Sequence, residues 1–249
     1  MVAKTFKTRT LMLTATLAAV YAVLRIIPTF PMVGVPGARF SASDSVASLY
    51  GILLGPYTSM VCIVVGTFIG YFAGRPPVFY GLDFTPAAVN SLIVGLLIRR
   101  LRLQALTLYL LLMILFAMHP YTLLTVNVPT ATGMGIPFPF FWLHLVGLIV
   151  LATPVGGYAV GNLFNRRVGY AALSFSVISL VGTLAQHLTG SILYASIILP
   201  LLSESARVKA WTLVFWLYPV ERLIIVAAST IIGLPVVRAL AFRLRPDQE

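Results

Sequence analysis

Long apolar runs constrain this chain more than any other feature of its sequence. Only 9% of its 249 residues are charged and 59% are hydrophobic, whereas charged residues make up about 25% of an ordinary soluble domain. A helix needs about 20 apolar residues to cross a bilayer, so eight crossings would take about 160 positions. We therefore predict an all-α polytopic membrane protein with about eight transmembrane helices.

The predicted spans follow the apolar runs along the chain. They cover 10–29, 45–55, 57–73, 85–98, 104–119, 140–163, 170–199 and 211–237. The second is short for a full crossing, and it meets the third at Gly55-Pro56, which is a turn signal.

The net charge of +11 is interpreted as a sign of membrane topology, because cytoplasmic segments of membrane proteins are enriched in Lys and Arg. With the amino end inside, eleven of the seventeen basic residues fall on the cytoplasmic side: Lys4, Lys7, Arg9, Arg99, Arg100, Arg102, Arg166, Arg167, Arg238, Arg243 and Arg245. We predict that both termini are cytoplasmic, and that the chain is a multi-pass protein of the cell membrane with no nucleic-acid partner.

The residue inventory disfavours several chemistries. Cys62 is the single cysteine, so an intramolecular disulfide and a thiolate metal cluster are excluded. A phosphate-binding loop needs a Lys directly after its second Gly, and no lysine of this chain follows a Gly. The three histidines show no fixed metal-ligand spacing. We predict a protein that is not an enzyme, with no catalytic residue, no metal site and no cofactor.

Three residues that are charged at neutral pH fall inside predicted spans, where each is expected to have a specific role because burying charge in lipid costs free energy. Arg25 lies near the outer end of the first span, and Glu221 with Arg222 lies about midway along the last. Adjacent helical residues point about 100° apart, so we expect Glu221 and Arg222 to find partners on other helices. Arg25 with Glu221 is one candidate pair, and Arg25 extending to the interface is an alternative. A structural ion pair and a ligand-contacting cluster both remain open.

Polar residues also gather in the outer half of the seventh span. His187, Ser191 and Tyr194 share one helix face, and Gln186 lies beside them. The segments 30–44 and 120–140 are broken by Pro and Gly, and are interpreted as loops folded over the outer mouth or as plain interfacial connectors. This arrangement indicates a binder that captures a small solute from outside.

The first span carries two overlapping pairs of alanines four residues apart, Ala15 with Ala19 and Ala18 with Ala22. Small residues at this spacing let another helix backbone approach closely in lipid. The pairs indicate either packing inside this bundle or a docking face for another membrane subunit.

The chain resembles the substrate-binding S components of energy-coupling factor (ECF) vitamin transporters. The motifs that carry the resemblance are 15–28, Ser43-Asp44, 53–56, 81–86 with Asn90, 95–100, 186–190 and 218–222. Such proteins usually have six helices. The resemblance therefore implies a single domain, 1–249, with four helices in 1–102, an added helix pair in 103–169 and two helices in 170–249.

The resemblance also implies partners and a site. A transmembrane coupling subunit, itself coupled to two ATPases, would contact Ala15, Ala18, Ala19 and Ala22. The loop after the first helix would close an outer pocket. From the residues themselves we expect arginines to pair with an anionic substituent, Glu221 with a cationic or hydrogen-bond-donating one, and Tyr194 and Trp216 to stack on a substrate ring. The predicted pocket residues are Arg25, Arg39, Asp44, Asp83, Asn90, Gln186, His187, Tyr194, Glu221 and Arg222.

The function predicted on these grounds is a high-affinity, membrane-embedded binding subunit for uptake of a vitamin or similar small nutrient. Two alternatives remain. One is a structural subunit of a larger membrane complex. The other is an intramembrane lipid-modifying enzyme, which would normally need a dense acidic site.

Overall fold

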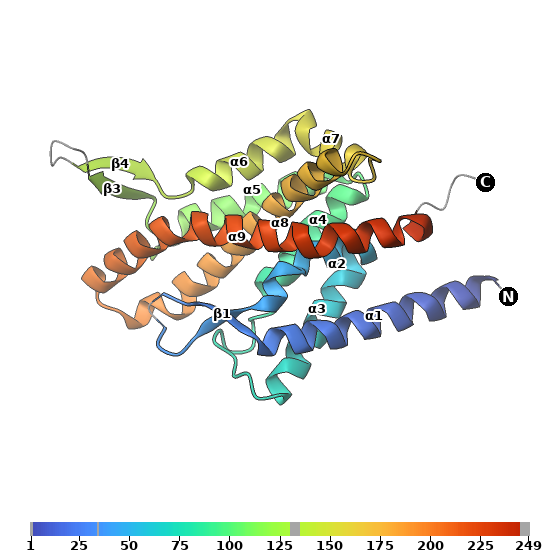
Figure 1. Cartoon of the computed structure of the whole chain (residues 1–249). Coiled ribbons are helices and arrows are strands. Elements are labelled where there is room, and N and C mark those ends of the chain that lie inside the picture. Colours follow the sequence, from blue (N-terminus) through green and yellow to red (C-terminus); the bar gives the residue numbers. More distant parts are fainter. Residues whose placement is uncertain (1, 34, 130–134, 245–249) are drawn as a thin grey trace.

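The computed structural model describes residues 2–33, 35–129 and 135–244 (Figure 1). Helix makes up 74% of the chain, which confirms the predicted all-α class. The helices are α1 (Val2–Ile26), α2 (Ala47–Leu54), α3 (Pro56–Phe72), α4 (Thr85–Ile98), α5 (Arg102–Met118), α6 (Trp142–Ala152), α7 (Pro154–Asn162), α8 (Val168–Ile197) and α9 (Glu204–Leu244). Two short 3-10 helices, η1 (Ala42–Ser45) and η2 (Leu199–Leu201), precede α2 and α9.

Helices α4 and α8 form the centre of the bundle. Helix α4 packs against α2, α3 and α8, and α8 also packs against α9. The apolar side chains of Ile93, Val94 and Leu97 on α4 are buried. At Gly95 a Cβ would overlap the backbone of Pro56, so the absence of a side chain lets α3 begin directly against α4.

Two of the described helical segments are long and apolar enough to cross a membrane, Val168–Leu201 and Glu204–Leu240. Helices α6 and α7 qualify only as a pair, bent by 74° where Pro154 begins α7, because proline cannot continue the preceding helix. The other apolar helical segments are shorter: Leu11–Ile26 within α1, and helices α3, α4 and α5. The longest of them has 17 residues, which span about 26 Å of a hydrocarbon layer about 30 Å thick. Membrane association is therefore supported, and the eight-span topology stays a prediction.

Helix α2 is a core element, whereas the sequence predicted a span at 45–55. Its eight residues are all buried inside the protein, and a helix of that length is only about 12 Å long. A segment surrounded by protein on every side is as apolar as one surrounded by lipid, so composition alone could not separate the two.

The two segments predicted as loops contain short β-hairpins. Strands β1 (Pro28–Pro31) and β2 (Arg39–Ser41) pair antiparallel across an irregular register, and β3 (Thr125–Pro129) pairs with β4 (Gly135–Pro139). The second hairpin projects from one end of the bundle (Figure 1); residues 130–134 of the predicted loop lie outside the described part. Proline lacks an N–H group and is tolerated at strand edges, which is why these Pro-rich segments can still pair as two-stranded ribbons.

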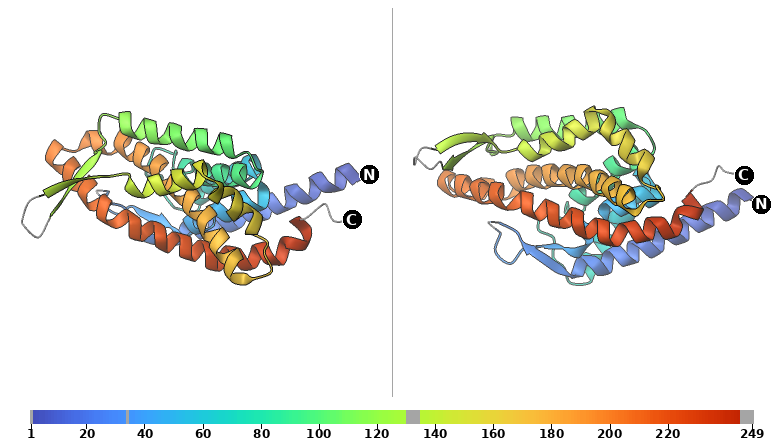
Figure 2. Two further views of the ribbon diagram at one scale, coloured as in Figure 1. Left: turned by 90° about the horizontal axis from the view of Figure 1, so that it is seen from above. Right: turned by 45° about the horizontal axis from the view of Figure 1, so that its top comes forward.

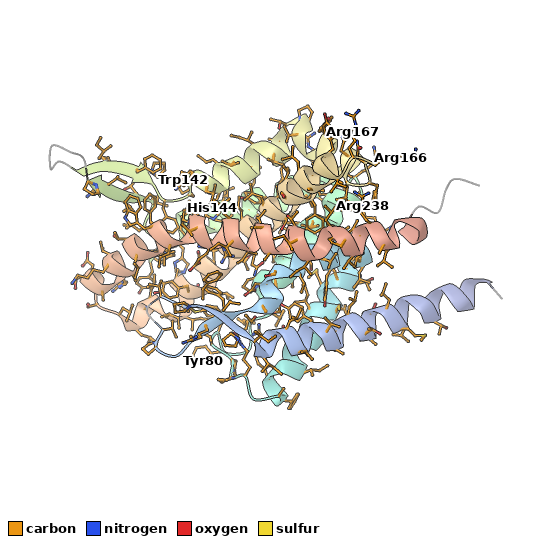
Figure 3. The ribbon with its side chains drawn as sticks, viewed as in Figure 1. Tyr80, Trp142, His144, Arg166, Arg167 and Arg238 are labelled. Atoms are coloured by element: carbon orange, nitrogen blue, oxygen red, sulfur yellow. The ribbon has the colours of Figure 1, made fainter. Side chains whose placement is uncertain are left out.

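The amino end of α1 and the carboxyl end of α9 lie at the same end of the molecule, opposite the β3–β4 hairpin (Figure 2). Arg166, Arg167 and Arg238 lie toward that end (Figure 3). This placement agrees with the predicted cytoplasmic side, which remains a prediction. The side chains of Lys4, Lys7, Arg9, Arg243 and Arg245 lie outside the described part of the chain.

Candidate functional site: a charged pocket

A cavity of about 110 Å³ lies between the end of α1, the β1–β2 hairpin, and helices α8 and α9. About 10–15 Å³ of such space holds one water molecule, so the cavity has room for a small solute. Its charged lining residues are Arg25, Arg39, Asp44, Arg75, Asp83, Glu221 and Arg222. Its polar and aromatic lining residues include Phe40, Ser41, Phe79, Gln186, His187, Ser191, Tyr194 and Trp211.

The structure brings nine of the ten predicted pocket residues together around this one cavity: Arg25, Arg39, Asp44, Asp83, Gln186, His187, Tyr194, Glu221 and Arg222. They come from two stretches of sequence, 25–83 and 186–222, that are separated by more than a hundred residues. Asn90, the tenth, is fully buried behind the wall. Contact of these residues with a ligand stays a prediction.

Arg25 and Asp83 form a buried ion pair at one wall of the pocket. Their side chains are 7% and 9% exposed, and Nη2 of Arg25 is 3.6 Å from Oδ1 of Asp83. The expected pair of Arg25 with Glu221 is therefore wrong. Gly70 makes room for the Arg25 side chain, because a Cβ there would come within 3.2 Å of its Cδ. The buried position also rules out the alternative in which Arg25 extends to the membrane interface.

The Asp83 carboxylate also organises the turn between α3 and α4. It accepts hydrogen bonds from the backbone N–H groups of Val78 and Phe79, at 2.9 Å and 3.1 Å, and from the Tyr71 hydroxyl at 3.1 Å. Hydrogen bonds to a charged group are stronger than those between neutral groups. Asp83 thus links the turn, α3 and α1 into one wall.

Arg222 and Glu221 form the second ion pair, at 3.6 Å between Nη2 and Oε2. The expectation that each residue would find its partner on another helix holds for Arg222, which bonds Thr183 on α8, but the ion pair itself is formed between the two neighbours. The Cα–Cβ bonds of adjacent helical residues point in different directions, but two long side chains can still bend toward each other. Both of these side chains line the pocket. Arg222 is 2% exposed and also donates to the Thr183 hydroxyl at 3.3 Å.

A chain of hydrogen bonds runs from the bundle centre to Asp44. The Ser48 hydroxyl donates to Oδ1 of Asn90 at 2.9 Å, Nδ2 of Asn90 donates to Oε1 of Gln186 at 2.8 Å, and Nε2 of Gln186 donates to Oδ1 of Asp44 at 2.6 Å. The backbone N–H of Ser41 donates to the other Asp44 oxygen at 3.1 Å. Asn90 therefore acts on the pocket through Gln186.

Arg75 belongs to the site although no sequence motif indicated it. Its Nη1 donates to the Arg25 carbonyl at 2.8 Å and its Nη2 donates to the Arg39 carbonyl, so it ties the turn after α3 to the β1–β2 hairpin. Burial, together with the nearby charge of Arg25, lowers the pKa of Arg75. Arg75 stays protonated at neutral pH because a guanidinium is not deprotonated in proteins.

Stacked rings stand behind the His187 side of the pocket. Nε2 of His144 lies 3.0 Å from Nδ1 of His187, and the His187 ring stacks on Tyr218 at 4.6 Å between centroids. His144 comes from α6 (Figure 3). This helix, which belongs to the predicted added helix pair, therefore packs behind the pocket residue His187. Trp216, expected to stack on a substrate, is 51% exposed, and the tryptophan at the cavity is Trp211.

The two alanine pairs of α1 lie in different surroundings. Ala18 and Ala22 are 3% and 4% exposed, and a Cβ at Gly66 on α3 would meet the Ala18 carbonyl. Both alanines are buried inside the protein, so they do not offer the predicted docking surface. Ala15 and Ala19 are exposed, which narrows the candidate docking face to that pair.

Comparison of the chain with protein-family models, with curated proteins and with solved structures finds no match. The pocket and the surface of α1 are therefore the features on which a function can be based.

We predict that Gly182→Ala on α8 lowers the thermal unfolding temperature, because the new Cβ would overlap the Asn90 side chain and break the chain of hydrogen bonds. Overpacking of this kind costs about 1–3 kcal/mol. The measurement is thermal unfolding of the purified protein in detergent.

The matched control is Gly169→Ala near the start of the same helix, where a Cβ meets nothing within 4 Å. It should leave the unfolding temperature unchanged or raise it, because alanine favours helix over glycine. Equal unfolding temperatures for the two variants would contradict the assigned role of the Asn90 contact.

Proposed function

We propose that this chain is the substrate-binding S component of an ECF-type transporter, which takes up a vitamin or similar small nutrient through the cell membrane. The observation that carries the proposal is the charged cavity between the first four helices and the last two. Ligand sites typically combine an apolar surround with a few convergent polar groups. Four arginines and three carboxylates line this one cavity. Placing so many charges inside an apolar bundle costs free energy, and binding of a polar solute would explain why they are there.

The exposed Ala15–Ala19 face supports the second part of the proposal, association with a transmembrane coupling subunit that is powered by two separate ATPases. Each alanine leaves the helix surface low, so another helix could approach the α1 backbone closely. In this arrangement the pocket faces outward, and both termini lie in the cytoplasm.

The acidic residues weigh against the alternative of a lipid-modifying enzyme. Each pocket carboxylate is engaged separately: Asp83 with Arg25, Glu221 with Arg222, and Asp44 with Gln186. A site that holds a divalent ion usually presents several carboxylate oxygens to one point. A purely structural subunit, the other alternative, would have no use for a polar cavity.

We expect the wild-type protein, purified from its native membrane in mild detergent, to carry a small solute that native mass spectrometry detects. Gly190→Leu should abolish this retention. Gly190 lines the cavity, and a Cβ added to it would lie 3.8 Å from its nearest neighbour, Cγ of Pro86. The new side chain would therefore enter open space and occupy the site.

Gly169→Leu is the matched control, on the same helix and away from the cavity, and should retain the solute. Repeated recovery of folded wild-type protein without any small molecule would contradict the proposed binding function.

We also expect Ala19→Leu to weaken association with the coupling subunit by about tenfold or more while solute retention is unchanged. Leucine would hold the partner backbone away from α1, and Ala19 is exposed, so folding should not suffer. Co-purification from membranes that contain both subunits measures the effect. Val20→Leu, an exposed position about 100° around the helix, is the control, and equal assembly of both variants would contradict the docking face.

A further inference from the structure

Three hydrogen-bond donors at the pocket are buried without a partner among the described residues. They are Nε of Arg25, Nε of Arg222 and the hydroxyl of Tyr194. All three residues line the cavity and are at most 6% exposed. A buried donor without a partner carries a desolvation penalty, so a ligand that supplies acceptors at this cavity would recover that cost.

The carboxylates at the pocket have no comparable need. Asp83 accepts three hydrogen bonds and faces Arg25, and Glu221 faces Arg222. Asp44 accepts from Gln186 and from the Ser41 backbone. The cavity therefore has hydrogen-bond donors without partners, and a ligand would have to supply hydrogen-bond acceptors.

The direction of the Asp44 hydrogen-bond chain strengthens this asymmetry. Asn90 donates to the amide oxygen of Gln186, which turns the Gln186 NH₂ group toward Asp44. Amide orientation follows from such a network, and this one commits Gln186 to satisfying the carboxylate.

The charges lead to the same conclusion. Four arginines and three acidic residues line the cavity, which leaves an excess of one positive charge. Arg25 and Arg222 are paired with carboxylates. The Arg75 guanidinium donates to two backbone carbonyls, and it forms neither of the two ion pairs found among the described residues.

We propose that the substrate is a small organic anion, a carboxylate attached to a flat apolar body. The carboxylate supplies the acceptors and the single negative charge that the cavity lacks. Phe40 and Trp211 line the same space and offer ring surfaces to the apolar body. This inference rests on the proposed function, because it takes the cavity to be the substrate site.

Three probes of similar shape and different charge test the substrate class: benzoate, neutral benzamide and the benzylammonium cation. Isothermal titration of the full chain in lipid nanodiscs gives the dissociation constant (Kd) of each. We expect benzoate to bind at least about tenfold more tightly than either of the others, because it alone brings a negative charge to the arginines. Equal binding of the three, preference for the amide or the cation, or no binding of benzoate would overturn the proposal.

Tyr194→Phe tests the assignment of a single donor. The Tyr194 hydroxyl has no hydrogen-bond partner among the described residues, so its removal should not lower the stability of the ligand-free protein. Loss of a hydrogen bond to a charged group should weaken benzoate binding by about tenfold or more. The control is Ser229→Ala, which removes another buried hydroxyl that has no partner in the described part of the chain and does not line the cavity.

Unchanged benzoate binding in Tyr194→Phe, or an equal loss in Ser229→Ala, would contradict the role of Tyr194. The identity of the co-purified solute separates this inference from the proposed function. A neutral or cationic solute would overturn the anion class and leave the binding function standing, whereas an anionic solute displaced by benzoate would support both.

Discussion

The cost of placing charge inside an apolar helix bundle governs the arrangement of this molecule. Arg25 and Arg222, both buried, each have a carboxylate partner at 3.6 Å, Asp83 for Arg25 and Glu221 for Arg222. Breaking a buried pair typically costs about 3–5 kcal/mol, because one charge is left behind. Arg25 is on α1 and Asp83 is on the turn before α4, whereas Arg222 and Glu221 are neighbours on α9, so each half of the chain neutralises its own buried arginine.

Hydrogen bonds, rather than the two ion pairs, join the distant stretches of sequence that form the pocket, as Gln186 does with Asp44. The turn after α3 is held by Asp83 and Arg75, and it meets the β1–β2 hairpin at the Arg39 carbonyl. On the opposite side, α8 contributes Gln186, whose amide is oriented by Asn90. The central position of α4 allows it to reach both walls, and Gly182 on α8 leaves the space that Asn90 occupies.

The sequence patterns locate the pocket better than they describe the contacts within it. The expense of charge in lipid singles out Arg25, Glu221 and Arg222, and the helical period places His187 and Tyr194 on one helix face; all of them line the cavity. The period cannot reveal pairing between adjacent residues, because that depends on where long side chains bend. Arg75 and Trp211 carry no signal, since an arginine in a loop and a tryptophan in a span are ordinary.

The fold shows the same division. The bounds predicted for α4, 85–98, agree with the structure, because a long apolar run between Pro86 and Arg99 has clear ends. Apolar composition does not separate a helix buried in protein from one buried in lipid, which is why the segment of α2 reads as a span. The hairpins escape prediction because Pro and Gly indicate a turn without indicating which strands flank it.

The most direct test of the pocket's role is an experimental structure of the protein purified from its own membrane without added ligand. We expect non-protein density in the cavity between Arg25 and Arg222, with acceptor atoms within hydrogen-bond distance of the Tyr194 hydroxyl. A well-resolved cavity that holds only ordered water, or that is closed by the protein's own side chains, would contradict a binding role for this pocket.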